Sequence, residues 1–257
     1  MPKFAANLTM MFSEWEFLDR FAAAADAGFQ AVEFLFPYAY APEDIRDRLE
    51  ANGLTPALFN LPPGDWAAGE RGLAALPWRG EAFRASLATA LRYAEAIGVK
   101  RLHVMSGNAD RENAVHRQTF EEALGYACDA ASPLGLDIVI EPINGRDMPG
   151  YFLNDFPFAI ETIKKLNRHN LKLQYDIYHR QILHGDVLQS LEAAMPLIGH
   201  IQVASVPARN EPGSGELNDH KVFHAIDALG YSGFIGCEYR PANGTLAGLR
   251  WLKTLDA

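Results

Sequence analysis

Residues 136–141 read LDIVIE and residues 171–176 read LKLQYD, two apolar runs that each end in a carboxylate. Two later apolar runs also carry an oxygen-bearing side chain, HIQV at 200–203 and FIGCE at 234–238. The four possible ligand residues are Glu141, Asp176, Gln202 and Glu238. They are 35, 26 and 36 residues apart, so each gap can hold one helix and the next strand. If the runs are neighbouring parallel strands, the four side chains converge at one end of a sheet.

The same alternation of strand-like and helical patterns runs through the whole chain. Besides those four runs, strands are predicted at 4–8, 31–34, 55–60 and 101–105. Helices are predicted at 14–27, 42–52, 80–97, 111–133, 154–166 (with Asn154 as its cap), 186–195, 219–229 and 246–255. Eight strand–helix units in 257 residues predict one α/β domain over residues 1–257, a (β/α)8 TIM barrel. No glycine-rich fingerprint follows the first strand, which disfavours an open nucleotide-binding sheet.

The amino-acid composition disfavours several classes of binding partner. The formal charge is −9 and the basic residues are scattered, which disfavours binding to a nucleic-acid backbone. No apolar run is long enough to suggest a membrane span, and the N-terminus lacks the pattern of a secretion signal. The two cysteines, Cys128 and Cys237, form no redox or metal spacing, which fits a reducing cytoplasm. We therefore expect a cytoplasmic enzyme of a small-molecule substrate, and a homo-oligomer is compatible with the sequence.

The four converging side chains predict a divalent metal site. Glu141, Asp176 and Glu238 bring three negative charges into one small volume, and a divalent cation removes that repulsion. Gln202 adds a neutral carbonyl oxygen as fourth ligand. An all-oxygen set favours Mg²⁺ or Mn²⁺ over Zn²⁺.

Two of these carboxylates also suit proton transfer. A hydrogen on the carbon between a carbonyl and a hydroxyl becomes acidic when a cation stabilises the resulting enediolate. Glu141 and Glu238 lie on the fifth and eighth predicted strands and can approach a substrate from opposite sides. One of them would remove the proton and the other would return it elsewhere.

At this point a family resemblance becomes specific. The matching motifs are FAANLTMMF at 4–12, VEFLFPY at 32–38, FNLPPGDW at 59–66, HVMSG at 103–107, EPINGRDMPGYF at 141–152, DIYH at 176–179 and GCEY at 236–239. They span nearly the whole chain, which resembles the hydroxypyruvate isomerases. That family belongs to the xylose isomerase-like barrels, as do 2-oxo-tetronate isomerases and ketose 3-epimerases.

The resemblance implies an isomerase that interconverts hydroxypyruvate and tartronate semialdehyde. It implies Glu141 and Glu238 as acid–base pair and metal ligands, with Asp176 and Gln202 completing the ligand set. His179 resembles the histidine that holds a substrate oxygen in ketose epimerases. A 2-oxo-tetronate isomerase or a ketose 3-epimerase with the same site is the alternative. Gln202 stands where the epimerases commonly have histidine, which weakens the epimerase interpretation.

Further residues are expected around the substrate. A carboxylate substrate needs a cationic partner, and Arg209 in the loop after the seventh predicted strand is the preferred anchor, with Arg146 as second candidate. His103 at the end of the fourth strand is expected to line the pocket. Trp66 and Glu70 lie in the long Pro- and Gly-rich segment 61–77 and are expected to cover the substrate. Two other tryptophans are assigned to packing: Trp78 and Trp251.

Two other classes of protein share the barrel. An abasic-site nuclease gathers several zinc ions with many histidine ligands, whereas this chain has 8 histidines and an acidic charge. A non-catalytic binding barrel is the other alternative. The nuclease is disfavoured because these histidines do not cluster at strand ends, and the binding barrel is kept only as a minor alternative.

Overall fold

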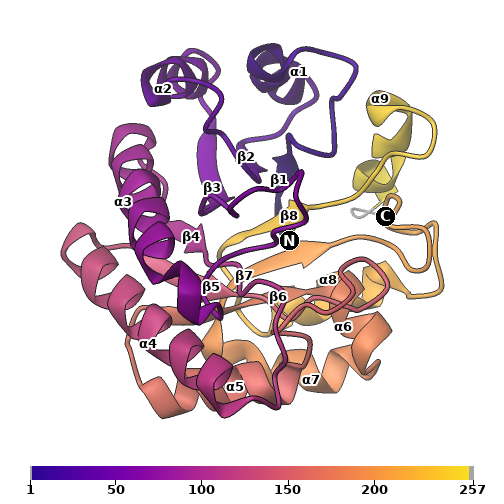
Figure 1. Ribbon diagram of the computed structural model, residues 1–257. Coiled ribbons are helices and arrows are strands. Elements are labelled where there is room, and N and C mark those ends of the chain that lie inside the picture. Colours follow the sequence, from indigo (N-terminus) through magenta and orange to yellow (C-terminus); the bar gives the residue numbers. More distant parts are fainter. Residues whose placement is uncertain (1, 255–257) are drawn as a thin grey trace.

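The computed structural model describes residues 2–254, and its centre is a closed barrel of parallel strands enclosed by helices (Figure 1). The strands are β1 (Lys3–Asn7), β2 (Ala31–Phe34), β3 (Thr55–Asn60), β4 (Arg101–His103), β5 (Asp137–Ile140), β6 (Leu171–Asp176), β7 (Ile198–Val203) and β8 (Phe234–Cys237). They follow one another around the ring in chain order, and β8 closes the barrel by pairing with β1. The prediction of a (β/α)8 barrel is confirmed.

Helices lie outside the strands and bury one face against them (Figure 1). The α-helices are α1 (Arg20–Asp26), α2 (Pro42–Ala51), α3 (Gly80–Ile97), α4 (Ala114–Ala131), α5 (Phe156–Leu166), α6 (Ile177–Leu183), α7 (Val187–Ala194), α8 (Asp219–Ala228) and α9 (Thr245–Gly248). In α3 the buried residues Phe83, Leu87, Ala90 and Ala94 recur at intervals of three or four, the period of one helical face. Gly98 then ends the helix in the left-handed conformation (φ 75°), which a side chain would disfavour.

The first predicted helix starts later than expected. It was predicted over residues 14–27, but α1 begins at Arg20 after a 3-10 turn at Phe17–Asp19. The carboxylate of Glu14 accepts hydrogen bonds from the backbone N–H and the hydroxyl of Thr245. Glu14 therefore links the loop after β1 to α9, and this long-range contact overrides its helical propensity.

Two local predictions in the second half of the chain were wrong. Asn154 does not cap α5: the cap is Asp155, whose carboxylate accepts from the backbone N–H of Phe158 at 2.8 Å. The helix α6 was not predicted at all. It begins directly after β6, because the side chain of Asp176 accepts from the backbone N–H of Tyr178 and caps it.

Of the two tryptophans that were assigned to packing, one is buried and one is exposed. Trp251 is buried and packs against Phe4 and Phe223. Trp78 is 69% exposed, so its assignment to packing was wrong. The helix predicted at 246–255 appears as α9 and a 3-10 helix (Leu249–Thr254), and residue 255 lies outside the described residues. None of the helices in residues 2–254 has the length and apolar character needed to cross a membrane.

Candidate active site

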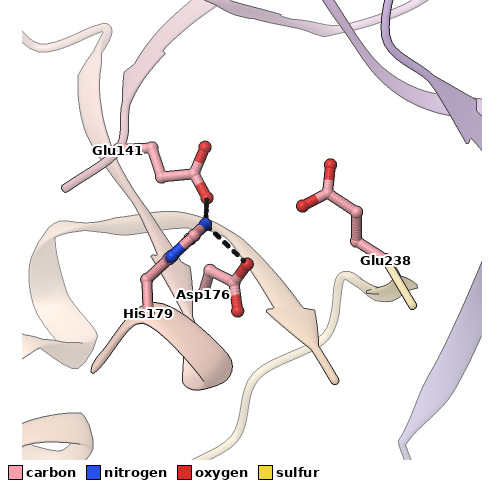
Figure 2. Close-up of side chains that lie close together, drawn as sticks. All are labelled: Glu141, Asp176, His179 and Glu238. Atoms are coloured by element: carbon pink, nitrogen blue, oxygen red, sulfur yellow. Dashed lines mark ion pairs between the residues drawn. The ribbon is translucent and has the colours of Figure 1, made fainter. Parts of the chain in front are cut away.

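Three carboxylates meet where β5, β6 and β8 end. Glu141 follows β5 directly, Asp176 is the last residue of β6, and Glu238 follows β8 directly. All three are at least 96% buried. Together with His179 they offer ligand atoms that all lie within 4.8 Å of one another. Figure 2 shows Glu141, Asp176 and His179 grouped together, with Glu238 approaching from β8. The predicted convergence of these carboxylates is thus present in the structure.

Gln202 lies beside this group. It pairs in register with Asp176 on β6 and with Gly236 on β8. Its Oε1 accepts a hydrogen bond from Gln174 Nε2 at 2.6 Å, and its Nε2 donates to Glu33 Oε1 at 2.8 Å. The amide is therefore fixed from below, and its oxygen keeps a second lone pair.

Below the carboxylates, a buried glutamate anchors a network that the sequence analysis missed. Glu33 accepts from Asn7 Nδ2 at 3.0 Å, and its Oε2 lies 2.6 Å from His200 Nε2. Gly236 leaves room for this carboxylate, since a Cβ there would lie 2.2 Å from Glu33 Oε2. The sequence feature that could have revealed Glu33 is an acidic residue within the apolar run of strand β2.

Burial raises the proton affinity of the three carboxyls. Desolvation raises the pKa of Asp176 to about 6, against the opposing charge of Arg209. Desolvation likewise raises the pKa of Glu238 to about 8. For Glu141, desolvation and then the charges of Glu238 and Asp176 raise the pKa well above its usual range. Carboxyl groups shifted in this way mark candidate functional sites.

The carboxylates also fit a cation. Glu141 Oε1 and Asp176 Oδ2 are buried and have no hydrogen-bond partner among the described residues. Buried carboxylate oxygens without donors are costly unless a cation compensates them. The carboxylates of this cluster, Glu141, Asp176 and Glu238, could therefore hold a metal ion.

Arg209 already balances part of this negative charge. Its Nη2 lies 2.6 Å from Glu238 Oε2 and 3.8 Å from Asp176 Oδ2, and its Nη1 lies 3.1 Å from Asp147 Oδ2. The guanidinium also lies over the ring of Tyr178, 4.9 Å from its centre. Although burial alone lowers its pKa, these carboxylates raise the pKa of Arg209 above its usual value. The loop backbone is left-handed at Arg209 (φ 56°), which is unusual for a non-glycine residue.

His179 is held in one orientation by Asn144, a residue that the sequence analysis did not select. The backbone N–H of Asn144 donates to His179 Nδ1 at 3.3 Å, and Asn144 Nδ2 lies 2.7 Å from the same atom. Burial and then the charge of Arg209 lower the pKa of His179 well below 6.5, so the ring is neutral. Because Nδ1 accepts, the ring proton is on Nε2, which lies 3.7 Å from Glu141 and 3.6 Å from Asp176. His179 thus points an N–H donor into the cluster.

A cavity of about 830 Å³ opens above the carboxylates. Its lining includes most of the predicted substrate-binding residues: His103, Arg146, His179, Arg209 and Trp66. Burial and then the charge of His200 lower the pKa of His103 to about 3, so this ring is neutral too. Glu70 does not line the cavity; it forms an ion pair with Arg79 at 2.7 Å.

Comparisons with known proteins identify relatives that match almost the whole chain. The chain is 57% identical over 255 residues to the 2-oxo-tetronate isomerase of Cupriavidus necator, covering 98% of each chain. It is 44% identical over 255 residues to the hydroxypyruvate isomerase of Escherichia coli, again covering 98% of each. A crystal structure of an AP endonuclease, family 2, from Brucella melitensis is 46% identical and superposes with a TM-score of 0.96 over 99% of both chains.

The sequence model of one family matches residues 21–255, nearly the whole barrel. The close relatives named as isomerases share the full length of the chain. The chain therefore belongs to the xylose isomerase-like TIM barrel family, within which it is an enzyme of the isomerase type.

Proposed function

We propose that this isomerase moves a proton between adjacent carbons of a short hydroxy-2-oxo acid, with Glu141 and Glu238 as the acid–base pair. The observation that carries the proposal is the meeting of these two buried carboxyls, with raised pKa values, at the mouth of the barrel. A group with a pKa near neutrality can both remove and return a proton at neutral pH. Hydroxypyruvate and 2-oxo-tetronate, which two relatives are named for, both carry a carboxylate, a ketone and a neighbouring hydroxyl-bearing carbon.

The proton balance of the reaction assigns the roles. One glutamate removes the C3 hydrogen as a proton, and the electron pair moves into an enediolate across C2 and C3. The other glutamate delivers a proton to C2, while the C3 hydroxyl proton moves to the C2 oxygen. For hydroxypyruvate the product is tartronate semialdehyde. The Nε2–H of His179 can donate to a developing oxyanion, because Asn144 fixes the other ring nitrogen as an acceptor.

The residues that would hold the divalent ion are Glu141, Asp176 and Glu238, with Gln202 as fourth oxygen donor. Oxygen ligands of this kind favour Mg²⁺ or Mn²⁺. When bound, such an ion neutralises the carboxylates and lowers the energy of the enediolate. The unpartnered oxygens of Glu141 and Asp176 support this assignment.

Arg209 is the proposed anchor for the substrate carboxylate. It lines the cavity and is held among three carboxylates, so its charge reaches the site where the acid must bind. The flat fork of an arginine suits a carboxylate because two N–H groups can donate in parallel. Free ketoses lack that group, so the arginine favours acids over the epimerase alternative.

Proton exchange in deuterated water tests the proposal. Wild-type protein with Mg²⁺ or Mn²⁺ is incubated with hydroxypyruvate, 2-oxo-tetronate or a free ketose, and the products are followed by NMR. We expect product carrying solvent deuterium from an acid substrate, and loss of turnover with a chelator. Turnover of the ketose alone would favour the epimerase, and no exchange with any of the three would overturn the proposal.

The name of the Brucella melitensis relative raises a nuclease as a second candidate. A site with several zinc ions needs many histidine ligands, whereas the metal-competent group in residues 2–254 contains three carboxylates and one histidine. Cleavage of a duplex containing an abasic site, at a rate above the isomerase rate, would favour the nuclease.

A further inference from the structure

The cavity has two chemically unlike walls. The strands follow one another around a ring of eight, so β3 and β4 lie opposite β7 and β8. Glu238 follows β8 and Arg209 belongs to the loop after β7, which makes that wall charged. The opposite wall ends in Asn60 on β3 and His103 on β4, which pair in register and both line the cavity.

Polar atoms on this second wall have no protein partner. Asn60 and His103 are 3% and 1% exposed. Asn60 Oδ1 and both ring nitrogens of His103 have no hydrogen-bond partner among the described residues. Glu141 Oε2 lies 3.7 Å from His103 Nδ1, which is too long for a hydrogen bond. Buried polar atoms without a partner are rare in folded proteins, so several at one cavity wall indicate a ligand that supplies the partner.

The unpartnered acceptor on Asn60 defines the ligand group. An amide oxygen needs a donor, and a carboxylate has none to give. A hydroxyl both donates and accepts, so it can satisfy Asn60 Oδ1 and one nitrogen of His103 together. The carboxylate of a substrate therefore belongs at Arg209, and a hydroxyl belongs at the opposite wall.

This orientation of the substrate, which rests on the function proposed above, determines how many carbons of the acid contact the protein. With C1 as the carboxylate near Arg209 and C2 and C3 reacting between the glutamates, a fourth carbon extends away from C1, toward β3 and β4. A three-carbon acid ends at C3 and places nothing there. We propose that Asn60 and His103 form a subsite for a terminal hydroxymethyl group, which makes four-carbon hydroxy-2-oxo acids better substrates than three-carbon ones.

Arg71 offers the main competing arrangement, since it lines the cavity on the β3 side. Its Nη1 donates to the carbonyls of Trp66 and Glu70, and the guanidinium stacks on the Trp66 ring at 3.9 Å, which leaves Nη2 and Nε for a ligand. If the carboxylate were at Arg71, the Asn60 side chain would face a part shared by both substrates. Replacing Asn60 would then affect both substrates equally.

Kinetics of Asn60→Leu tests the subsite. The measured quantity is kcat/KM for 2-oxo-tetronate divided by kcat/KM for hydroxypyruvate. We expect the wild-type ratio to exceed one and Asn60→Leu to lower it by about tenfold or more, the scale of one lost hydrogen bond. Asn60→Ser, which keeps a small polar group, should retain part of the ratio. An unchanged ratio, or equal loss for both substrates, would overturn the subsite.

Asn170→Leu is the matched control. Asn170 is also a buried asparagine, but it precedes β6 at the opposite end of the barrel and donates to the carbonyls of Cys128 and Leu136. Its replacement should lower thermal stability and leave the substrate ratio unchanged. A changed ratio in this variant would mean that general destabilisation moves the ratio, and the Asn60 result would then not support the subsite.

Binding of acids that cannot react separates this inference from the proposed function. Erythronate and glycerate are four- and three-carbon hydroxy acids without a ketone, and calorimetry in the presence of Mn²⁺ measures their affinities. We expect the wild-type protein to bind erythronate about tenfold more tightly, and Asn60→Leu to lose the difference. That preference without turnover would overturn the proposed function and keep the subsite, whereas equal wild-type affinities would overturn the subsite.

Discussion

Glu33 and Glu141 are both buried glutamates in the same barrel, yet their carboxylates differ in how many hydrogen bonds they accept. Both oxygens of Glu33 are paired, with Asn7, Gln202 and His200 at 2.6 to 3.0 Å. Glu141 Oε1 has no hydrogen-bond partner among the described residues. A carboxylate whose bonds are all made within the protein is fixed as scaffold. One that lacks them is available to a ligand.

These two glutamates lie in different layers of side chains. The lower layer consists of Glu33, Asn7, Gln202 and His200, and the upper layer of Glu141, Asp176 and Glu238. The lower layer around Glu33 fixes the amide of Gln202, and through Asn7 it reaches Glu238 Oε1 at 3.5 Å. The upper layer carries the carboxyls whose pKa values burial raises. The fully paired lower layer therefore helps to hold the upper carboxyls in position.

The largest expected effect comes from removing the upper carboxylates. Glu141→Gln and Glu238→Gln keep the shape of the side chain but cannot exchange a proton, so each should lower kcat by about 10³-fold or more. Steady-state kinetics with Mn²⁺ measures this, with circular dichroism as control for folding. Near-normal turnover in both variants would contradict their acid–base roles.

Replacing Arg209 should lower activity less than replacing either glutamate. Arg209→Ala removes the proposed carboxylate partner, and kcat/KM for an acid substrate should fall by about 10²-fold, mainly through KM. Arg146→Ala is the control, because Arg146 lines the same cavity but forms no ion pair with Glu238. A larger loss in Arg146→Ala than in Arg209→Ala would transfer the anchor to Arg146.

The lower layer is tested by stability rather than by activity. Gly236→Ala places a Cβ 2.2 Å from Glu33 Oε2, which forces the paired carboxylate to move. We expect the free energy of unfolding to fall by about 2 kcal/mol, a typical result of overpacking, as measured in urea. Gly80→Ala is the control: no atom lies within 4 Å of its added Cβ, so no loss is expected. Equal stabilities of the two variants would show that Glu33 can shift freely.

The last expected effect is a pH dependence of metal binding. Asp176 and Glu238 have pKa values raised to about 6 and about 8, so protons compete with the ion below pH 8. The apparent affinity for Mn²⁺ should weaken by about tenfold per pH unit for each proton displaced, as calorimetry between pH 8 and pH 6 can measure. An affinity independent of pH would contradict the raised pKa values.

The same shifts fix the sign of a stability effect. A raised carboxyl pKa means that the folded state binds more protons than the unfolded state between the ordinary and the raised value. For Glu238 this window runs from 4.5 to about 8, so its contribution to metal-free stability falls as pH rises through it. Comparing the wild type with Glu238→Gln isolates that contribution.

Much of the fold was readable from local pattern. The predicted strands at 31–34 and 55–60 and the helix at 80–97 match β2, β3 and α3 to the residue. The helix has a regularly spaced buried face and ends at Gly98, and each strand is a short run of mostly apolar residues. Where prediction failed, at Glu14 and at the start of α6, a contact with a distant residue or a cap shared with the site decided the structure.

The candidate site was only partly predictable. Carboxylates at strand ends could be identified because parallel strands bring their ends together. The pairing of Asn144 with His179, 35 residues apart, depends on side-chain positions that no spacing encodes. Nor does spacing encode the use of Glu70, which forms an ion pair with Arg79 at the end of a 3-10 helix (Pro77–Arg79).

The place of Arg209 among Glu238, Asp176 and Asp147 bears on how the enzyme is made. This built-in counter-ion offsets part of the buried negative charge without any bound ion, so folding of the barrel does not have to wait for a metal. Under the proposed metal dependence, the ion would be needed for turnover and not for folding, so a shortage of it would silence the enzyme without unfolding it.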